Sequence, residues 1–184
     1  MNVVLLDAYN LIYRARYSFA AKGEHGTVYS FFRSLRALLE RLEPDKAYFV
    51  LEGVPEARLE ILPSYKGNRV RDVDETFREH KKIIIDMMSD LFPIHAVRHP
   101  RQECDDVIAS LAKKHTDAGD SCIVVSTDTD FIQLYNTCSG VKIYNPIKKK
   151  FVEPPTFDYV TWKSLRGDPS DNIPGIKGIG DKRA

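Results

Sequence analysis

The sequence lacks the marks of a disulfide-bonded or membrane-spanning protein. Its 184 residues include only three cysteines, Cys104, Cys122 and Cys138, and no CxxC pair. Such cysteines are typical of reduced cytosolic thiols and argue against a disulfide framework or a zinc site. The apolar runs, such as residues 83–85, are far too short to span a bilayer, and no signal peptide precedes Val3. We therefore expect a cytoplasmic protein without a membrane partner.

Net charge is also nearly absent, at +1, but the charges are unevenly distributed. Residues 103–130 hold seven Asp or Glu and two Lys, whereas residues 142–184 hold nine Lys or Arg and five acids. An acidic pocket beside a basic flank would suit a cation-dependent enzyme that acts on polyanions. Chance produces the same charge asymmetry in many globular proteins. The function must therefore be inferred from the sequence motifs. The lysine run at 148–150 is interpreted as solvated surface.

Short β-branched runs alternate with amphipathic helical patterns along the chain. This alternation predicts an α/β layer fold with a largely parallel sheet, and the length indicates one domain with a sizeable core. The polar stretch 52–74 has no apolar period, and no internal repeat or low-complexity segment is found. The predicted strands are 3–6, 47–51, 94–97, 122–125 and 141–144, and the predicted helices are 27–42, 77–92 and 105–115.

Acidic residues directly follow three of the predicted strands. Asp7 follows 3–6, Glu52 follows 47–51, and Asp128 and Asp130 follow 122–125. The crevice beyond the carboxyl ends of parallel strands is where such folds bind ligands. Asp128 and Asp130 point the same way in extended backbone, and at about 5 Å and an effective dielectric near 20 their repulsion costs roughly 3 kcal/mol. The alternative, equally favoured locally, is that Asp128 caps a helix that begins near Phe131.

The segment QECDDVIASL adds three more acids, Glu103, Asp105 and Asp106. Two of them continue the apolar stripes of the predicted helix, since Glu103 is in phase with Val107 and Asp105 with Ile108. Acids in a first helical turn also favour the helix dipole, but three together favour a site.

The last motif, RGDPSDNIPGIKGIGDKRA at 166–184, combines an acidic pair with a glycine run. Asp168 and Asp171 lie three residues apart in a loop rich in glycine and proline. Glycines free backbone N–H groups to approach a phosphate, and basic side chains add charge. The glycines are Gly175, Gly178 and Gly180, and the basic residues are Lys177, Lys182 and Arg183.

In order and spacing, these motifs resemble the 5′-nuclease superfamily of phage 5′–3′ exonucleases, flap endonucleases and the N-terminal nuclease domains of bacterial family-A DNA polymerases. The resemblance covers essentially the whole chain and is closest to the phage and bacterial branch. It implies a PIN-like three-layer core at 1–165, with a helical arch at about 53–80, and the start of a helix–hairpin–helix at 166–184. Because the chain ends at Ala184, we expect that last element to be incomplete. The motifs are Asp7, YKGNR at 65–69, ECDD at 103–106, STDTD at 126–130 and GDPSDNIPGIKGIG at 167–180.

The resemblance implies a divalent-metal-dependent 5′–3′ exonuclease and structure-specific flap endonuclease of DNA replication and repair. Its expected substrates are DNA with 5′ ends, flaps or nicks, and RNA–DNA hybrids, and we expect a monomer in the phage or bacterial cytosol. The implied cofactors are two Mg²⁺ or Mn²⁺ ions, which suit all-oxygen ligands, and K⁺ at the helix–hairpin–helix.

The resemblance also assigns roles to individual residues. Lys66 and Arg69 would act on the scissile phosphate, Tyr65 would stack on a terminal base, and Arg14 would contact a phosphate near the first strand. Glu52 stands where many relatives have aspartate, and it either reaches a metal through water or is a bystander. The implied metal ligands are Asp7, Glu103, Asp105, Asp106, Asp128, Asp130, Asp168 and Asp171, and the further DNA-binding residues are Gly175, Gly178, Gly180 and Lys182.

Three alternatives remain open from the sequence. A haloacid-dehalogenase-like phosphatase also carries a DxD after a strand, but residue 9, two after Asp7, is tyrosine. A PIN-type ribonuclease shares the acidic core and lacks the glycine-rich hairpin. A non-catalytic DNA-binding relative would be expected to lose some of these acids, which this chain keeps.

Overall fold

A single mixed sheet organises the molecule. The computed structural model describes residues 1–21, 23–68 and 74–180. Strand order is β3-β2-β1-β4-β5-β6, in which β1 to β5 pair in parallel and β6 pairs antiparallel to β5. The strands are β1 (Asn2–Asp7), β2 (Lys46–Leu51), β3 (His95–Arg98), β4 (Ser121–Val125), β5 (Val141–Asn145) and β6 (Lys150–Val152).

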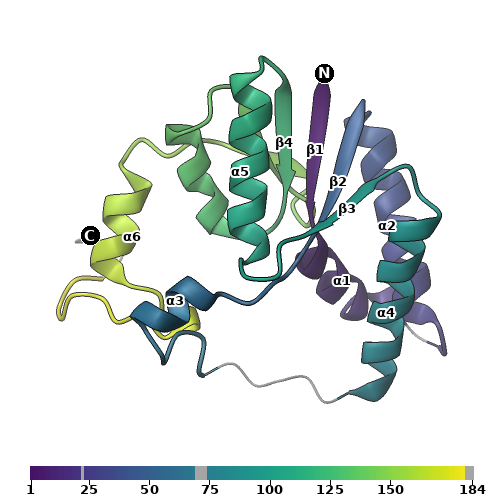
Figure 1. The fold of residues 1–184 in the computed structure, drawn as a ribbon, viewed down its shortest axis with the longest axis horizontal. Helices are drawn as coiled ribbons and strands as arrows, with labels where there is room; N and C mark the ends of the chain where they lie inside the picture. The colour runs from purple at the N-terminus through teal and green to yellow at the C-terminus, as the bar shows by residue number, and fades with distance from the viewer. Residues whose placement is uncertain (22, 69–73, 181–184) are drawn as a thin grey trace.

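Helices cover both faces of the sheet and make three layers (Figure 1). Val4 and Leu6 of β1 pack toward α1 (Ala8–Arg16), α2 (Gly26–Leu42) and α4 (Glu75–Asp90). Val3 and Leu5 pack toward α5 (Cys104–Asp117) and the 3₁₀ helix η2 (Thr129–Asn136). Central strands buried on both faces need continuous apolar runs, as 3–6 and 122–125 have. The α/β fold with a mostly parallel sheet is therefore confirmed.

The remaining elements are short and lie near the carboxyl end of the sheet. They are η1 (Phe19–Ala21), α3 (Glu56–Ile61), α6 (Tyr159–Arg166) and η3 (Pro169–Asp171). The segment 64–68 that follows α3 contacts the loop of η3, because Asn68 Nδ2 donates to the Pro169 carbonyl at 2.9 Å and Asn172 Nδ2 to the Ser64 carbonyl at 3.0 Å. The segment after α3 and the last part of the chain thus meet at one end of the sheet (Figure 1).

Residues 52–74 carry no apolar period, yet α3 lies within them, with no buried residue. Between Gly167 and Gly180 the described chain forms η3 and no α-helix, so the second helix of a helix–hairpin–helix would lie outside the described residues. Among the described residues, no helix is long and apolar enough to cross a membrane.

Candidate metal centre and active site

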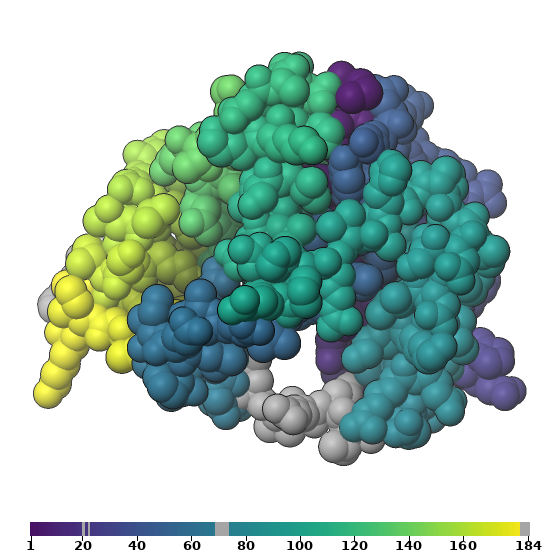
Figure 2. Space-filling view, viewed as in Figure 1, coloured from purple at the N-terminus to yellow at the C-terminus, as the bar shows by residue number. Residues whose placement is uncertain are grey.

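Most of the predicted acids line one open cleft of about 1310 Å³ at the carboxyl end of the sheet, whereas Glu103 and Asp106 line a neighbouring cavity. Strand register explains the convergence, because Leu6 of β1 pairs with Val125 of β4, and Asp7 pairs with Val50 of β2. The side chains that follow these strands therefore emerge at the same level. Figure 2 shows an opening at this end, between α3 and α4. Acids lining the cleft are Asp7, Glu52, Asp105, Asp128, Asp130, Asp168 and Asp171.

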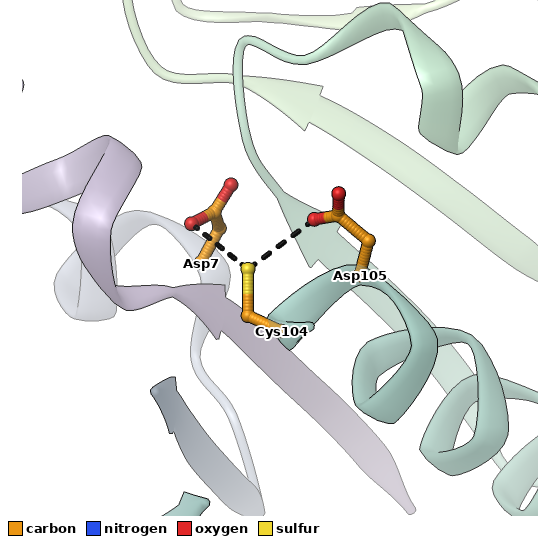
Figure 3. Close-up of side chains that lie close together, drawn as sticks. All are labelled: Asp7, Cys104 and Asp105. Carbon is orange, nitrogen blue, oxygen red and sulfur yellow. Dashed lines mark hydrogen bonds between the residues drawn. The ribbon is translucent and has the colours of Figure 1, made fainter. Parts of the chain in front are cut away.

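The centre of the cleft is a cluster of Asp7, Cys104 and Asp105, whose ligand atoms all lie within 4.8 Å of one another (Figure 3). We call it the Asp7–Asp105 cluster. The Cys104 Sγ donates to Asp105 Oδ1 at 3.3 Å and lies 3.9 Å from Asp7 Oδ1. Asp7 ends β1, is 5% exposed, and accepts from Ser126 Oγ at 2.8 Å and from the Asn10 backbone N–H at 3.1 Å. These bonds fix the carboxylate of Asp7 at the start of α1.

Burial disfavours the ionised form of the carboxyl groups in this cluster when no cation is bound. Burial raises the pKa of Asp7 to about 6 and that of Asp105 to about 7, and the nearby carboxylates of Asp128 and Glu52 contribute to both increases. Burial also raises the pKa of the Cys104 thiol well above its usual range, so the sulfur keeps its proton. Within the described part of the chain, no Lys, Arg or His forms an ion pair with Asp7 or Asp105. The cluster therefore favours a bound cation at neutral pH.

A second acidic group is already neutralised by basic side chains. Glu103 is 1% exposed, and it contacts Lys66 Nζ, Arg58 Nη1 at 2.8 Å and the Tyr65 hydroxyl at 3.0 Å. Arg58 also forms a bidentate pair with Asp106, at 2.5 and 2.8 Å. These bonds hold α3 and the segment 64–68 against the start of α5.

The acidic residues that follow β4 are close to another basic side chain, that of Lys163. Lys163 Nζ of α6 contacts Asp130 Oδ1 and lies 2.9 Å from Asp168 Oδ2. Burial opposes ionisation of Asp168, but hydrogen bonds from Ser170 and Lys163 outweigh it and lower its pKa to about 2. Asp128 accepts from the Asp130 backbone N–H at 2.8 Å and caps η2, so the capping interpretation is correct for this residue. The expected repulsion between Asp128 and Asp130 is therefore relieved in part by Lys163.

Glu52 has a definite structural role. Its carboxylate accepts from the Cys104 backbone N–H at 3.1 Å, at the first turn of α5. A carboxylate there satisfies a free N–H group and interacts favourably with the helix dipole. Glu52 thereby positions the helix start that carries Cys104 and Asp105.

The predicted DNA-contacting residues are placed unevenly. Arg14 and Lys66 line the cleft, and burial lowers the pKa of Arg14. Tyr65 is only 8% exposed, and its hydroxyl donates to Glu103 and, at 3.2 Å, to Asp171. Its ring is not exposed for stacking on a base in this structure, so stacking requires Tyr65 to move. Arg69 and Lys182 lie outside the described residues.

The three glycines of the last motif also differ. A Cβ at Gly175 would lie 1.9 Å from the Arg166 carbonyl oxygen, whereas Gly178 and Gly180 have open space around them. Gly175 thus permits close backbone packing beneath the Asp168 loop, and the other two remain predicted phosphate contacts.

Several site residues have little or no signal in the sequence. Ser126 and Asn10, which orient Asp7 and the loop after β4, sit within three residues of predicted acids and could have been found as capping or turn residues. Arg58 and Lys163 come from distant segments, 48 and 33 residues from their partners Asp106 and Asp130, so only the fold reveals them.

Comparison with known proteins places this site in context. The family described as "5′–3′ exonuclease, N-terminal resolvase-like domain" matches residues 2–161. DNA polymerase I of Treponema pallidum is 32% identical over 201 residues, covering 98% of this chain and 20% of that protein. The thermostable DNA polymerase I of Thermus thermophilus is 33% identical over 200 residues, covering 99% and 23%. The chain thus spans about a fifth of the length of these relatives.

Solved structures from bacteriophage T5 share the fold. The 5′-exonuclease with bound zinc ions superposes with a TM-score of 0.80 at 25% identity, covering 100% of this chain and 73% of that one. The T5 flap endonuclease in a pseudo-enzyme–product complex with DNA and metal ions gives a TM-score of 0.80 at 25% identity, covering 100% and 72%.

Proposed function

The chain belongs to the 5′–3′ exonuclease family of N-terminal, resolvase-like domains, as its motifs indicated, and we propose that it hydrolyses phosphodiester bonds near the 5′ ends of DNA with the help of a divalent metal ion. It acts as a 5′–3′ exonuclease and a flap endonuclease. The comparisons support this function over the phosphatase, the ribonuclease and the non-catalytic relative.

One observation carries the proposal: the Asp7–Asp105 cluster pairs a buried and a half-buried carboxylate without a compensating cation, in an open cleft that Lys66 and Arg14 also line. Carboxylate oxygens are the ligands that Mg²⁺ and Mn²⁺ prefer, and the thiol of Cys104 is not needed for either ion. The donor set therefore fits a hard divalent cation held by Asp7 and Asp105. When bound, such a cation supplies charge neutralisation and polarises a phosphoryl oxygen.

A second metal ion would bind less readily than the first, because the remaining carboxylates already pair with basic side chains. Of the remaining acids, Glu103 and Asp106 pair with Arg58, and Asp130 and Asp168 pair with Lys163. For a second ion to bind beside Asp130 and Asp168, Lys163 would have to leave both carboxylates. We propose that the first ion binds at the Asp7–Asp105 cluster and that occupancy of the second site depends on displacing Lys163.

The chain's own residues supply the rest of the chemistry. Ser126 and Asn10 orient the carboxylate of Asp7, and Glu52 fixes the start of α5. Lys66 and Arg14 would neutralise the phosphate that lies over the cluster, and preorganised cations at such a position stabilise developing negative charge. Lys66 has a φ of 54°, an unusual conformation for a lysine, so its placement is specified by its surroundings.

A cleavage assay tests the proposal. DNA labelled at the 5′ end is offered as a flap, a nicked duplex, a blunt duplex and an RNA–DNA hybrid, with Mg²⁺, with Mn²⁺ or with EDTA. We expect short 5′-terminal products from each substrate in Mg²⁺ or Mn²⁺ and no products in EDTA. We also expect the enzyme to be a monomer. Metal-independent cleavage, or degradation that begins at 3′ ends, would overturn the proposal.

A further inference from the structure

The Cys104 thiol is the one part of the Asp7–Asp105 cluster to which the proposed function gives no role. The side chain of Cys104 is 5% exposed, and its sulfur points toward both carboxylates (Figure 3). The Sγ atom lies 3.3 Å from Asp105 Oδ1 and 3.9 Å from Asp7 Oδ1. Asp7 precedes Cys104 by 97 residues, so the fold brings these ligand atoms together without any CxxC motif in the sequence.

The other two cysteines show how a cysteine with only a packing role is placed in this fold. Cys122 of β4 and Cys138 are buried in the same apolar cluster as Cys104. Among the described residues, neither sulfur forms a hydrogen bond with a carboxylate. Packing accounts for Cys122 and Cys138, whereas Cys104 also completes a set of three ligand atoms that could hold one metal ion.

The distances within this set are close to those of a tetrahedral metal site. With a metal–sulfur bond of about 2.3 Å and a metal–oxygen bond of about 2.0 Å, a tetrahedral ion places sulfur and oxygen about 3.5 Å apart. The observed Sγ to Oδ1 distances of 3.3 and 3.9 Å lie on either side of that value. All three residues also line the open cleft, so water can occupy the fourth position.

We propose that Asp7, Cys104 and Asp105 form a site for thiophilic divalent cations, Zn²⁺ and Cd²⁺, which bind there more tightly than Mg²⁺ and inhibit cleavage by taking its place. As the metal–sulfur bond forms, the S–H bond of Cys104 breaks and its proton passes to solvent. Mg²⁺ prefers an octahedral set of oxygen ligands and gains little from sulfur. The inference deepens the proposed function, on which it rests for the identity of the displaced ion.

Cadmium binding in the absence of DNA tests the ligand set directly. Cd²⁺ is titrated into the metal-free, reduced protein, and the ultraviolet charge-transfer absorption of the cadmium–thiolate bond is followed. We expect wild type to develop this band with one Cd²⁺ per chain. Cys104→Ala should lose the band and bind Cd²⁺ at least about 100-fold more weakly. Mg²⁺ binding, followed through stabilisation against denaturant, should depend on Cys104 much less than Cd²⁺ binding does.

Inhibition by zinc is the second measurement. The Zn²⁺ concentration that halves Mg²⁺-dependent cleavage is compared between wild type and Cys104→Ala, each relative to its own rate without Zn²⁺. A tetrahedral ion with three protein ligands keeps one open position, whereas Mg²⁺ keeps several waters, so bound Zn²⁺ should lower the rate. We expect the inhibitory concentration to rise by at least about 10-fold in Cys104→Ala.

The matched controls are Cys122→Ala and Cys138→Ala, which remove equally buried thiols and should keep both the band and the Cd²⁺ affinity. Thermal unfolding checks that each variant folds, and Cys104→Ser, which keeps the size of the side chain, repeats the test. A band that survives removal of the Cys104 sulfur, or unchanged Cd²⁺ affinity, would overturn the inference. If Cd²⁺ binds through Cys104 but no DNA is cut in Mg²⁺, the proposed function fails and the site remains.

Discussion

At the scale of single residues, the acids in and beside the cleft include two kinds. Glu103, Asp106, Asp130 and Asp168 each contact a lysine or an arginine, whereas Asp7 and Asp105 contact only neutral donors among the described residues. Hydrogen bonds from Ser170 and Lys163 lower the pKa of Asp168, whereas burial without a paired cation raises the pKa of Asp7 and Asp105.

The first prediction concerns the stability of the metal-free protein. Burial holds the pKa of Asp105 near 7 and of Asp7 near 6, above the ordinary value of 3.8, so the folded state binds more protons than the unfolded state between about pH 4 and pH 7. Stability in EDTA should therefore fall as pH rises through that range. Asp105→Asn should raise the free energy of unfolding by about 1–3 kcal/mol at about pH 8 and have little effect near pH 4.

Denaturant unfolding in EDTA across this pH range is the measurement. Asp117→Asn, on the exposed end of the same helix and paired with Lys113, is the control and should follow wild type. Adding Mg²⁺ should stabilise wild type more than Asp105→Asn, because only wild type keeps both ligands. A destabilised Asp105→Asn at high pH would contradict this account of the cluster.

The second prediction concerns Lys66, whose ammonium group contacts Glu103 and lines the cleft. A cation beside the scissile phosphate should act on the transition state more than on the bound substrate. Lys66→Met, which keeps the side-chain stem, should lower the single-turnover rate by about 100-fold or more and change DNA affinity much less. If affinity falls as much as rate, Lys66 only docks the DNA.

The sequence predicts the carboxylates better than the cations for a physical reason. Strand ends and helix starts are local patterns, so the sequence alone assigns Asp7, Glu52 and Asp105 to one edge of the sheet. The partners Arg58 and Lys163 depend on how α3 and α6 pack against the rest of the molecule, which no local sequence pattern specifies. Tyr65 shows the same limit, since its burial among acids follows from the fold of 64–68 onto the loop of η3.

At the scale of elements, the predicted strands and helices are all found, including the short β3, whereas α1, α3, β6 and α6 are not predicted. Helix α1 starts directly after β1, with Asp7 as its N-cap, so no loop in the sequence separates the strand from the helix. Strand β6 is only three residues long. It begins at Lys150, within a lysine-rich turn. Helix α3 buries no residue and is held by the bonds of Arg58. In each case the element is specified by contacts with other elements rather than by an apolar periodicity in its own sequence.

The third prediction separates two glycines of the last motif. The backbone of Gly175 packs against Arg166 and Gly167, whereas Gly180 has open space. Gly175→Ala should therefore displace the loop of Asp168, destabilise the protein by about 1–3 kcal/mol and reduce cleavage, because the added methyl group overlaps backbone. Gly180→Ala should leave stability unchanged and can affect only DNA binding. Chemical denaturation of both variants is the check, and equal stabilities would show that the close packing around Gly175 is not needed.

At the scale of the whole molecule, the parallel sheet is what brings the site together. Acids from β1, β2, β4 and the start of α5 reach one cleft because parallel strands end at the same edge. Arg14 and Lys66 line the same cleft, so acidic and basic groups gather there although the net charge of the chain is only +1.

We propose that the Asp7–Asp105 cluster holds the divalent ion with which this chain hydrolyses DNA near its 5′ ends. Single-turnover cleavage of a 5′-labelled flap, measured against Mg²⁺ concentration for wild type, Asp7→Asn and Asp117→Asn, tests it most directly. We predict that Asp7→Asn loses at least about 100-fold in rate, that saturating Mg²⁺ does not restore it, and that Asp117→Asn matches wild type. Full cleavage by Asp7→Asn in Mg²⁺ would contradict the account.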